Sequence, residues 1–258
     1  MNEDNGGKIN FYKAENMELV LGKKILHSFP NHIHEKYCIG LILSGKVNFY
    51  IKDKFYELVE GDIYLINPSE PHSLTSANNS VISYRVVCFT SFPKNNRVFN
   101  KHIIRNKKLR NEIDMFIDNT IKDKSIDCDR FYNIILKETF DIIEIRNNEE
   151  EDERIRIARE YIRANIESKI PLDDIARKAN ISKYYFLRIF KEKLGMSPHK
   201  FHTQQKLRLA KGMIVKEISL VNIGCELGFV DQSHFINTFK KYTGVTPKEY
   251  RNSYKDLV

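Results

Sequence analysis

Three histidines in the first third of the chain have the residue type and spacing that metal or ligand binding requires. His32 and His34 form a His-x-His pair, and His72 follows Pro71 further along the chain. A neutral imidazole presents one nitrogen acceptor and one N–H donor, and its free nitrogen is a ligand of zinc and iron. The same side chains can line a pocket for a small organic molecule or hydrogen-bond to loop backbone. The spacing alone leaves all three roles open.

A second pattern lies in the last hundred residues, where one unit occurs twice. Residues 172–201 and 220–250 match at a shift of 48 in the first half of the unit and 49 in the second. The matched pairs include Leu172 with Leu220, Ile175 with Ile223, Phe186 with Phe235, Phe190 with Phe239, and Gly195 with Gly244. A unit that keeps its apolar spacing but slips by one residue is a structural element used twice, with the slip in a turn.

Each copy is predicted to be a short helix, a tight turn and a longer helix. Asn180 and Gly228 occupy the same place in the turn, and both residue types tolerate the left-handed backbone that ends a helix. Ser182 and Asp231 then act as N-caps of the second helix, and Val230 is the extra turn residue of the second copy. Two short helices around a turn, the second one amphipathic, predict a helix-turn-helix.

The positive charge of the chain lies entirely with this repeat. The whole chain carries 42 Lys and Arg against 34 Asp and Glu. Residues 153–258 hold 21 against 11, net +10, whereas residues 1–152 hold 21 against 23, net −2. A basic excess confined to one part of the chain is typical of a module that binds nucleic-acid phosphates.

The repeated region resembles the DNA-binding domain of the AraC/XylS family of transcription regulators. The most specific motifs are Ile223-Gly-Cys-Glu-Leu-Gly-Phe229, Ser233-His-Phe235, Gly244-Val-Thr-Pro247 and Tyr250-Arg251. The resemblance implies two second helices that lie in successive major grooves. It also implies a long connecting helix, here over about Pro198 to Ile214.

The same resemblance implies which side chains contact DNA. Those facing base edges would be Tyr184, Leu187, Arg188, Gln232, Ser233, Ile236 and Asn237. Those facing phosphates would be Lys183, Lys191, Lys240 and Lys241. Arg188 suits guanine, and Gln232 or Asn237 suits adenine. Asn237 departs from the family pattern, in which arginine is common, so we expect the second copy to read DNA less strongly or to prefer adenine there.

Short β-rich runs fill the chain from about residue 18 to residue 89, and they predict a sandwich or barrel. They are Leu19–Leu21, Ile25–Phe29, Cys38–Leu43, Val47–Ile51, Phe55–Val59, Ile63–Ile66 and Val81–Phe89. Together with the His-x-His pair, the Gly61-Asp62 turn and Pro71-His72, they resemble the cupin barrel that forms the effector domain of many AraC/XylS regulators.

In catalytic cupins a nearby glutamate completes a metal site with the histidines, but here Tyr37-Cys38-Ile39 stands in its place. The resemblance therefore implies a pocket for a small organic effector at His32, His34, Tyr37 and His72. A three-histidine site for zinc or iron stays the alternative. A purely structural role at the barrel mouth stays open as well.

Between Ile103 and Arg146 the apolar period becomes helical. Two stripes are expected: Leu109, Ile113, Phe116, Ile117 and Ile121, then Phe131, Ile134, Ile135, Glu138, Ile142 and Ile145. Such helices can cover the barrel or form a dimer seam, and the family resemblance favours a homodimer. The acidic run 147–153 suits a linker.

We thus predict an α+β chain of two domains. A cupin-like effector-binding and dimerisation domain spans residues 1–147, a linker spans 148–153, and an all-α domain with two helix-turn-helix motifs spans 154–258. Cys38, Cys88, Cys128 and Cys225 are far apart and typical of reduced thiols. No apolar run is long enough for a membrane span, and the start of the chain has no signal-peptide pattern, which favours a cytoplasmic protein.

The expected function is that of a DNA-binding transcription regulator, by resemblance an activator that contacts RNA polymerase at a promoter. A small-molecule effector in the barrel would change its DNA affinity. We expect no catalytic residue, no cofactor and no resident metal. The alternatives are a metal-dependent cupin enzyme fused to a DNA-binding domain, and a ligand-independent regulator whose barrel is only a dimerisation scaffold.

Overall fold

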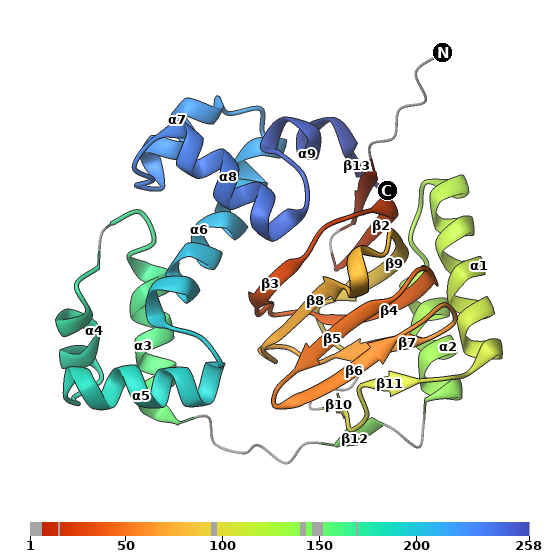
Figure 1. The fold of residues 1–258 in the computed structure, drawn as a ribbon, viewed down its shortest axis with the longest axis horizontal. Coiled ribbons are helices and arrows are strands. Elements are labelled where there is room, and N and C mark those ends of the chain that lie inside the picture. The colour runs from red at the N-terminus through yellow and green to blue at the C-terminus, as the bar shows by residue number, and fades with distance from the viewer. Residues whose placement is uncertain are drawn as a thin grey trace.

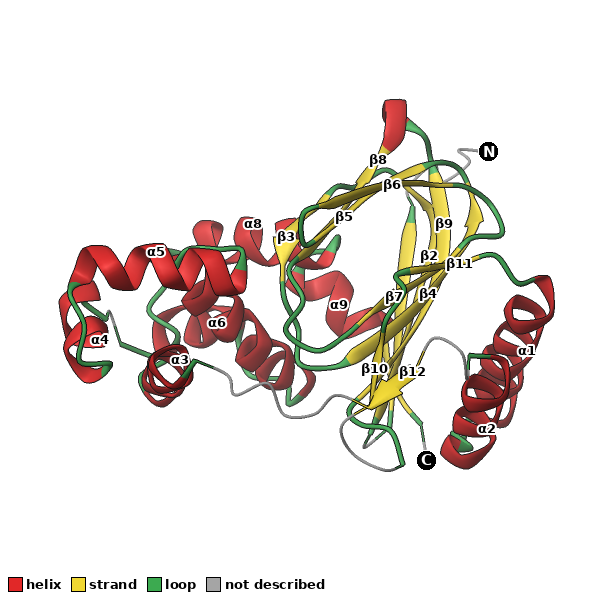
Figure 2. Ribbon diagram, turned by 90° about the horizontal axis from the view of Figure 1, so that it is seen from below, coloured by secondary structure: helices red, strands yellow, loops and turns green. Residues whose placement is uncertain are grey.

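Two facing β-sheets form the N-terminal part of the chain (Figures 1 and 2). The computed structural model describes residues 7–14, 16–93, 97–139, 143–145, 152–168 and 170–257. The larger sheet has the order β11-β7-β4-β9-β2-β1-β13 and the smaller one the order β3-β8-β5-β6. A separate pair, β10 (Arg97–Phe99) with β12 (Ile143–Ile145), lies at one end.

The strands of the larger sheet are β1 (Lys8–Lys13), β2 (Met17–Ile25), β4 (Tyr37–Ser44), β7 (Ile63–Ile66), β9 (Ile82–Phe89), β11 (Ile103–Ile104) and β13 (Tyr254–Asp256). Those of the smaller sheet are β3 (Phe29–His32), β5 (Val47–Ile51), β6 (Lys54–Leu58) and β8 (His72–Ser76). The predicted barrel-like fold is confirmed.

The two faces of the larger sheet contribute side chains to two different hydrophobic cores, because successive side chains of a strand point to opposite faces. On β4, Cys38 and Ile42 face the space between the sheets, with Phe49 and Tyr64. Ile39 and Leu41 face outward. On that outer side lie α1 (Lys107–Asp123) and α2 (Cys128–Glu138), which bury the predicted apolar residues Leu109, Ile113, Phe116, Ile117, Phe131 and Ile135 (Figure 2).

The helical region is shorter at both ends than its periodicity predicts. Ile103 belongs to strand β11, and α2 ends at Glu138. Ile145, predicted to extend the second stripe, pairs with Arg97 in the β10–β12 ladder, and Ile142 lies outside the described residues. The β-branched residues here satisfy a strand equally well, and the cross-strand partner decides between the two.

The C-terminal part contains seven helices within the described residues: α3 (Glu153–Ala164), α4 (Leu172–Lys178), α5 (Lys183–Leu194), α6 (Pro198–Val215), α7 (Leu220–Glu226), α8 (Gln232–Thr243) and α9 (Pro247–Ser253). The two helix-turn-helix units, α4–α5 and α7–α8, are confirmed. Asn180 and Gly228 have φ of 54° and 61° in the two turns. Ser182 and Asp231 cap α5 and α8 with their side chains. No helix of the described ranges is long and apolar enough to cross a membrane.

The second helix-turn-helix packs directly on the barrel (Figure 1). The Tyr250 ring of α9 packs against the Phe11 ring of β1 at a tilt of 54°, with ring centroids 4.6 Å apart. Past Ser253 the chain is no longer helical, because Tyr254–Asp256 pairs in parallel with β1 as strand β13. One strand of the larger sheet therefore comes from the end of the chain, an addition to the predicted all-helical region.

Candidate effector site and nucleic-acid interface

The recognition helix of the first copy, α5, presents most of its predicted DNA-contacting side chains to solvent. Tyr184 is 85% exposed, and Arg188 and Lys191 are exposed as well, while Leu187 and Lys183 are half-buried. The Lys183 ammonium pairs with the Asp173 carboxylate at 2.9 Å. The Arg188 guanidinium lies 5.2 Å from the ring centre of Tyr185, a cation–π contact that holds it at the helix surface.

The recognition helix of the second copy, α8, also presents most of its predicted DNA-contacting side chains to solvent. Gln232, Ser233, Asn237, Lys240 and Lys241 are exposed, whereas Ile236 is partly buried against the core. The far end of α8 lies on the barrel. There the His27 ring nitrogen Nε2 lies 3.1 Å from the Lys241 carbonyl, and a Cβ on Gly244 would come within 2.7 Å of Ile9.

The two exposed helix faces lie at opposite ends of α6 (Figure 1). An 18-residue helix is about 27 Å long, comparable to one turn of B-DNA, so one chain can offer both faces to successive grooves. The predicted packed side of α6 is confirmed, since Phe201, Leu207, Ala210 and Ile214 are all buried.

The three histidines predicted as ligand-binding residues lie together. His32 of β3 is the register partner of His72 on β8, and His34 follows two residues later. Ring centroids are 4.2 Å apart for His32 and His72, and 4.7 Å apart for His34 and His72. One ring nitrogen of each lies within 4.8 Å of the other two.

Each of the three rings uses its Nδ1 atom to hydrogen-bond a backbone carbonyl. The partners are Pro30 for His32 at 2.8 Å, Lys36 for His34 at 2.9 Å, and Glu70 for His72 at 2.8 Å. A carbonyl oxygen can only accept, so Nδ1 must carry the hydrogen in all three rings. The lone pair of each neutral ring is therefore on Nε2.

Burial keeps these histidines neutral. It lowers the pKa of His32 to about 4 and that of His34 to about 3, because an imidazolium loses its hydration there. Burial also lowers the pKa of His72 well below its usual value, and the neighbouring histidines add to the effect. All three rings are thus free bases at neutral pH.

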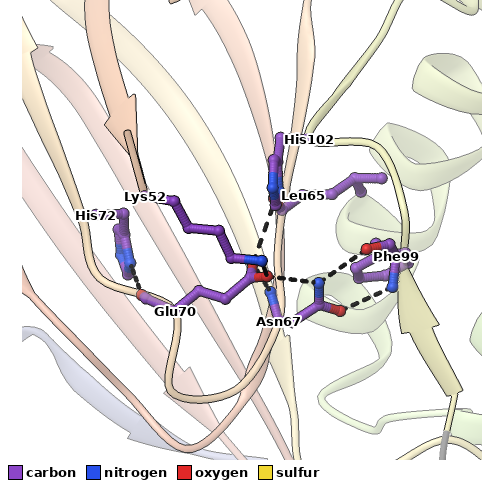
Figure 3. A network of polar contacts seen from close by, with 7 residues as sticks. All are labelled: Lys52, Leu65, Asn67, Glu70, His72, Phe99 and His102. Carbon is purple, nitrogen blue, oxygen red and sulfur yellow. Dashed lines mark hydrogen bonds and ion pairs between the residues drawn. The ribbon is translucent and has the colours of Figure 1, made fainter. Parts of the chain in front are cut away.

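A polar network behind His72 fixes the loop that carries it (Figure 3). The Glu70 carboxylate accepts from Lys52 at 2.8 Å and from the backbone N–H of Asn67 at 3.0 Å. The Asn67 side chain in turn makes two hydrogen bonds with the Phe99 backbone. Burial alone would raise the pKa of Glu70, but the bonds from Lys52 and Asn67 outweigh it and lower the pKa.

Tyr37, the fourth predicted ligand residue, does not join the histidines. Its ring stacks on Phe89 on the other face of the larger sheet, and its hydroxyl donates to the Arg97 carbonyl at 2.6 Å. It also lines a cleft of about 1350 Å³ between barrel and first helix-turn-helix, shared with Glu70 and Lys191. Cys38, beside Tyr37, lies near the histidines instead, with Sγ 3.5 Å from His34 Nε2.

The segment that carries His32 and His34 also contacts the DNA-binding part through its other residues. Asn31 Nδ2 donates to the carbonyl of Gly195 at 2.9 Å, and Gly195 ends α5. The Ile33 backbone N–H donates to Gln204 Oε1 of α6 at 3.0 Å. Glu35 pairs with Arg163 and Arg208. Asn31, Ile33 and Glu35 could not be predicted from the sequence as contact residues, because contacts between distant segments leave no local pattern.

The chain combines two helix-turn-helix units that expose their second helices with a β-barrel domain that holds a cluster of ligand-type histidines. This combination is typical of a DNA-binding regulator with a sensing domain. Comparison with known families agrees: residues 16–92 match the AraC-like ligand binding domain, and residues 175–253 match a helix-turn-helix domain. The chain belongs to the AraC family of transcription regulators, which is not an enzyme family. The alternative of a metal-dependent enzyme is therefore not supported.

Relatives match over most of their length. The chain is 24% identical over 230 residues to the uncharacterized HTH-type transcriptional regulator YbfI of Bacillus subtilis, covering 82% of this chain and 83% of that protein. It is 24% identical over 243 residues to the Msm operon regulatory protein of Streptococcus mutans, covering 87% of each. It is 21% identical over 247 residues to the lactose operon transcription activator of Staphylococcus xylosus, covering 86% of each.

A solved structure has the same two-domain fold. ToxT of Vibrio cholerae superposes with a TM-score of 0.61 at 16% identity, covering 93% of this chain and 99% of that one. A structure of ToxT with a bound unsaturated fatty acid gives a TM-score of 0.57 at 17% identity, covering 97% of each chain.

Proposed function

We propose that this regulator is a transcription activator whose DNA binding is controlled by an effector held at His32, His34 and His72. One observation carries the proposal: the segment from β3 to β4 supplies two of the histidines and, with its alternate residues, contacts both α5 and α6. An effector that moves the histidines therefore acts on a segment that holds the DNA-binding helices. Activation is supported by the name of the S. xylosus relative.

The DNA contacts follow from exposure and chemistry. Arg188, Gln232 and Asn237 would read base edges, with Tyr184, Leu187, Ser233 and Ile236 beside them. Lys183, Lys191, Lys240 and Lys241 would contact phosphates, which set position without reading sequence. The two domains would span residues 1–147 and 154–258, as predicted from the sequence. Strand β13, at the end of the second domain, would pair with the sheet of the first. The protein would act in the cytoplasm, where its promoter and RNA polymerase are.

A homodimer would form through the outer side of α1 and α2. Their apolar stripes are covered by the chain's own sheet, so a partner would have to use the opposite side. There Met115 is 59% exposed beside Ile134, in a groove with charged residues of both signs. Such a mixed surface suits a modest interface more than an obligate one.

The experiment is selection of DNA from a random pool by the full-length protein, followed by in vitro transcription with RNA polymerase on a promoter carrying the selected site. The expected result is a site with two half-elements about one helical turn apart, and more transcript when protein is added. Failure to enrich any sequence would contradict specific DNA reading. Less transcript would replace activation by repression. A response unaffected by any ligand would favour the scaffold alternative.

A further inference from the structure

The free ring nitrogens of the three histidines indicate the chemical class of the molecule or ion that they bind. Each Nδ1–H is hydrogen-bonded to a backbone carbonyl, so the atoms that remain available to bind a ligand are the three Nε2 nitrogens with their lone pairs. Metal-bound histidines in proteins use this arrangement, in which the second ring nitrogen is bonded to backbone or carboxylate and so orients the ring. An organic ligand at this cluster would have to bring three hydrogen-bond donors to the three acceptors, whereas one metal ion accepts all three lone pairs.

The surroundings also fit a cation that is held firmly. His72 is 2% exposed, and the Glu70–Asn67–Lys52 network fixes its loop (Figure 3). His32 is fixed by strand pairing with β8. Three imidazoles at short mutual distance suit zinc and its neighbours cobalt and nickel, which accept nitrogen ligands.

We propose that His32, His34 and His72 bind one divalent transition-metal ion of the zinc class through Nε2, and that this ion is the effector of the regulator. The inference rests on the proposed function, since it names the chemical class of the effector at the same site. The Cys38 thiol, beside His34, is not required for the three-histidine set.

The segment that carries His32 and His34 also connects the metal site to the DNA-binding helices. Along β3 and the following residues, His32 and His34 face the cluster, while Asn31, Ile33 and Glu35 bond to α5, α6 and α3. Ile33 is also buried in the core of the first helix-turn-helix. An ion that draws His32 and His34 toward His72 therefore changes the position of residues that hold the DNA-binding part. Coupling arises because the two arrangements of this segment bind the metal with different affinity.

The test uses the untagged full-length protein, zinc for affinity and cobalt for its visible absorption. We expect one equivalent of zinc by calorimetry and, with cobalt, d–d bands typical of nitrogen ligands. On a DNA site selected from a random pool, saturating zinc should change affinity about 5-fold to 150-fold, the usual range of allosteric coupling.

The decisive variants are His34→Asn and His72→Asn. Asparagine keeps an amide donor near the position of Nδ1, so the carbonyl bond of a merely structural histidine is retained, but it has no atom at Nε2. Both variants should lose the one equivalent of bound metal and the zinc-dependent change in DNA affinity. His199→Ala, which removes an exposed histidine outside the cluster, should keep the full stoichiometry.

Each of the other possible results contradicts one specific part of the proposal. No stoichiometric uptake by the wild-type protein, or equal uptake by both asparagine variants, overturns the metal site. Cobalt spectra of the wild type decide this even if a variant does not fold. Uptake without any change of DNA affinity overturns the effector role. If the protein selects no DNA, the proposed function fails, and the metal result stands apart from it.

Discussion

At the scale of single residues, the two recognition helices differ most at one pair of aligned positions. Arg188 on α5 corresponds to Asn237 on α8, and both side chains are exposed. Arginine makes two hydrogen bonds to guanine from a fixed fork, whereas asparagine matches adenine with one donor and one acceptor. The chain therefore has one stronger and one weaker base-reading position, and the repeat is symmetric in fold but not in chemistry.

The first prediction concerns Arg188. Arg188→Ala should weaken binding to the selected site by about 1–3 kcal/mol and relax base preference in one half-site, because the lost bonds are to a base. Lys191→Ala, one turn along the same helix, should weaken binding to all sequences alike. Fluorescence anisotropy on selected and scrambled duplexes separates the two. Equal losses on both duplexes for Arg188→Ala would show that it contacts only the backbone.

The histidines show what residue type can and cannot predict. The His-x-His pair and the later His72 indicated a common site, and the structure brings the three rings together. Their tautomer could not be predicted, because it depends on carbonyls of Pro30, Lys36 and Glu70 that only the folded backbone brings near. Tyr37 was grouped with them by proximity in sequence, but strand alternation turns it to the other face.

At the scale of elements, the helix-turn-helix units could be predicted closely because their signals are local. The N-caps, the turn residues and the 3.6-residue apolar period all lie within a few positions of the structure they specify. Strands β5 and β7 match their predicted limits. Strands β1, β8, β10, β11, β12 and β13 were not predicted. Most of them are short, and each is defined by a strand partner that local periodicity does not show.

A second prediction tests the turns of the repeat. Gly228→Ala should destabilise the protein by about 1–2 kcal/mol, since alanine pays the left-handed backbone penalty at φ 61°. Its Cβ would also come within 3.0 Å of the Glu167 carbonyl. Urea unfolding measures the change. Asn180→Ala is the matched variant in the other turn. It should reduce the free energy of unfolding by less, because asparagine, unlike glycine, already carries a Cβ in the left-handed conformation. A larger loss at Asn180 would contradict this account.

A third prediction concerns α9, the element that joins the second unit to the barrel. Thr246 and Glu249 form a capping box, with reciprocal side-chain-to-backbone bonds. Thr246→Ala should cost roughly 1 kcal/mol, typical of a lost N-cap. Thr246→Ser keeps the hydroxyl and should restore most of it. Unfolding midpoints of the two variants check this, and equal midpoints for alanine and serine would show that the cap contributes nothing.

At the scale of the whole molecule, barrel and DNA-binding region share one continuous core. Phe49 and Tyr64 between the sheets belong to the same buried cluster as Phe235 and Phe239 of α8. The second helix-turn-helix is thus held by the barrel, whereas the first has its own core and reaches the barrel through Ile33. Local sequence patterns do not encode this packing between the two predicted domains, so it could not be predicted from the sequence.

The last prediction tests whether the first unit is held by the histidine segment. Gln204 of α6 bridges the domains: its Oε1 accepts from Ile33 N–H, and its Nε2 donates to the Asn31 carbonyl at 3.4 Å. Gln204→Ala leaves the buried Ile33 N–H without this acceptor, which should cost about 1–3 kcal/mol. Amide hydrogen exchange of the peptide containing Ile33 should accelerate. The zinc-dependent change in DNA affinity should shrink while zinc stoichiometry stays the same, because the ligand atoms are untouched. Thr203→Ala, at the neighbouring position of α6, should leave all three measurements unchanged. If Gln204→Ala accelerates exchange at Ile33 but leaves the zinc response intact, the signal would instead have to pass through the contact of α8 with β3, next to the bond between the His27 ring and the Lys241 carbonyl.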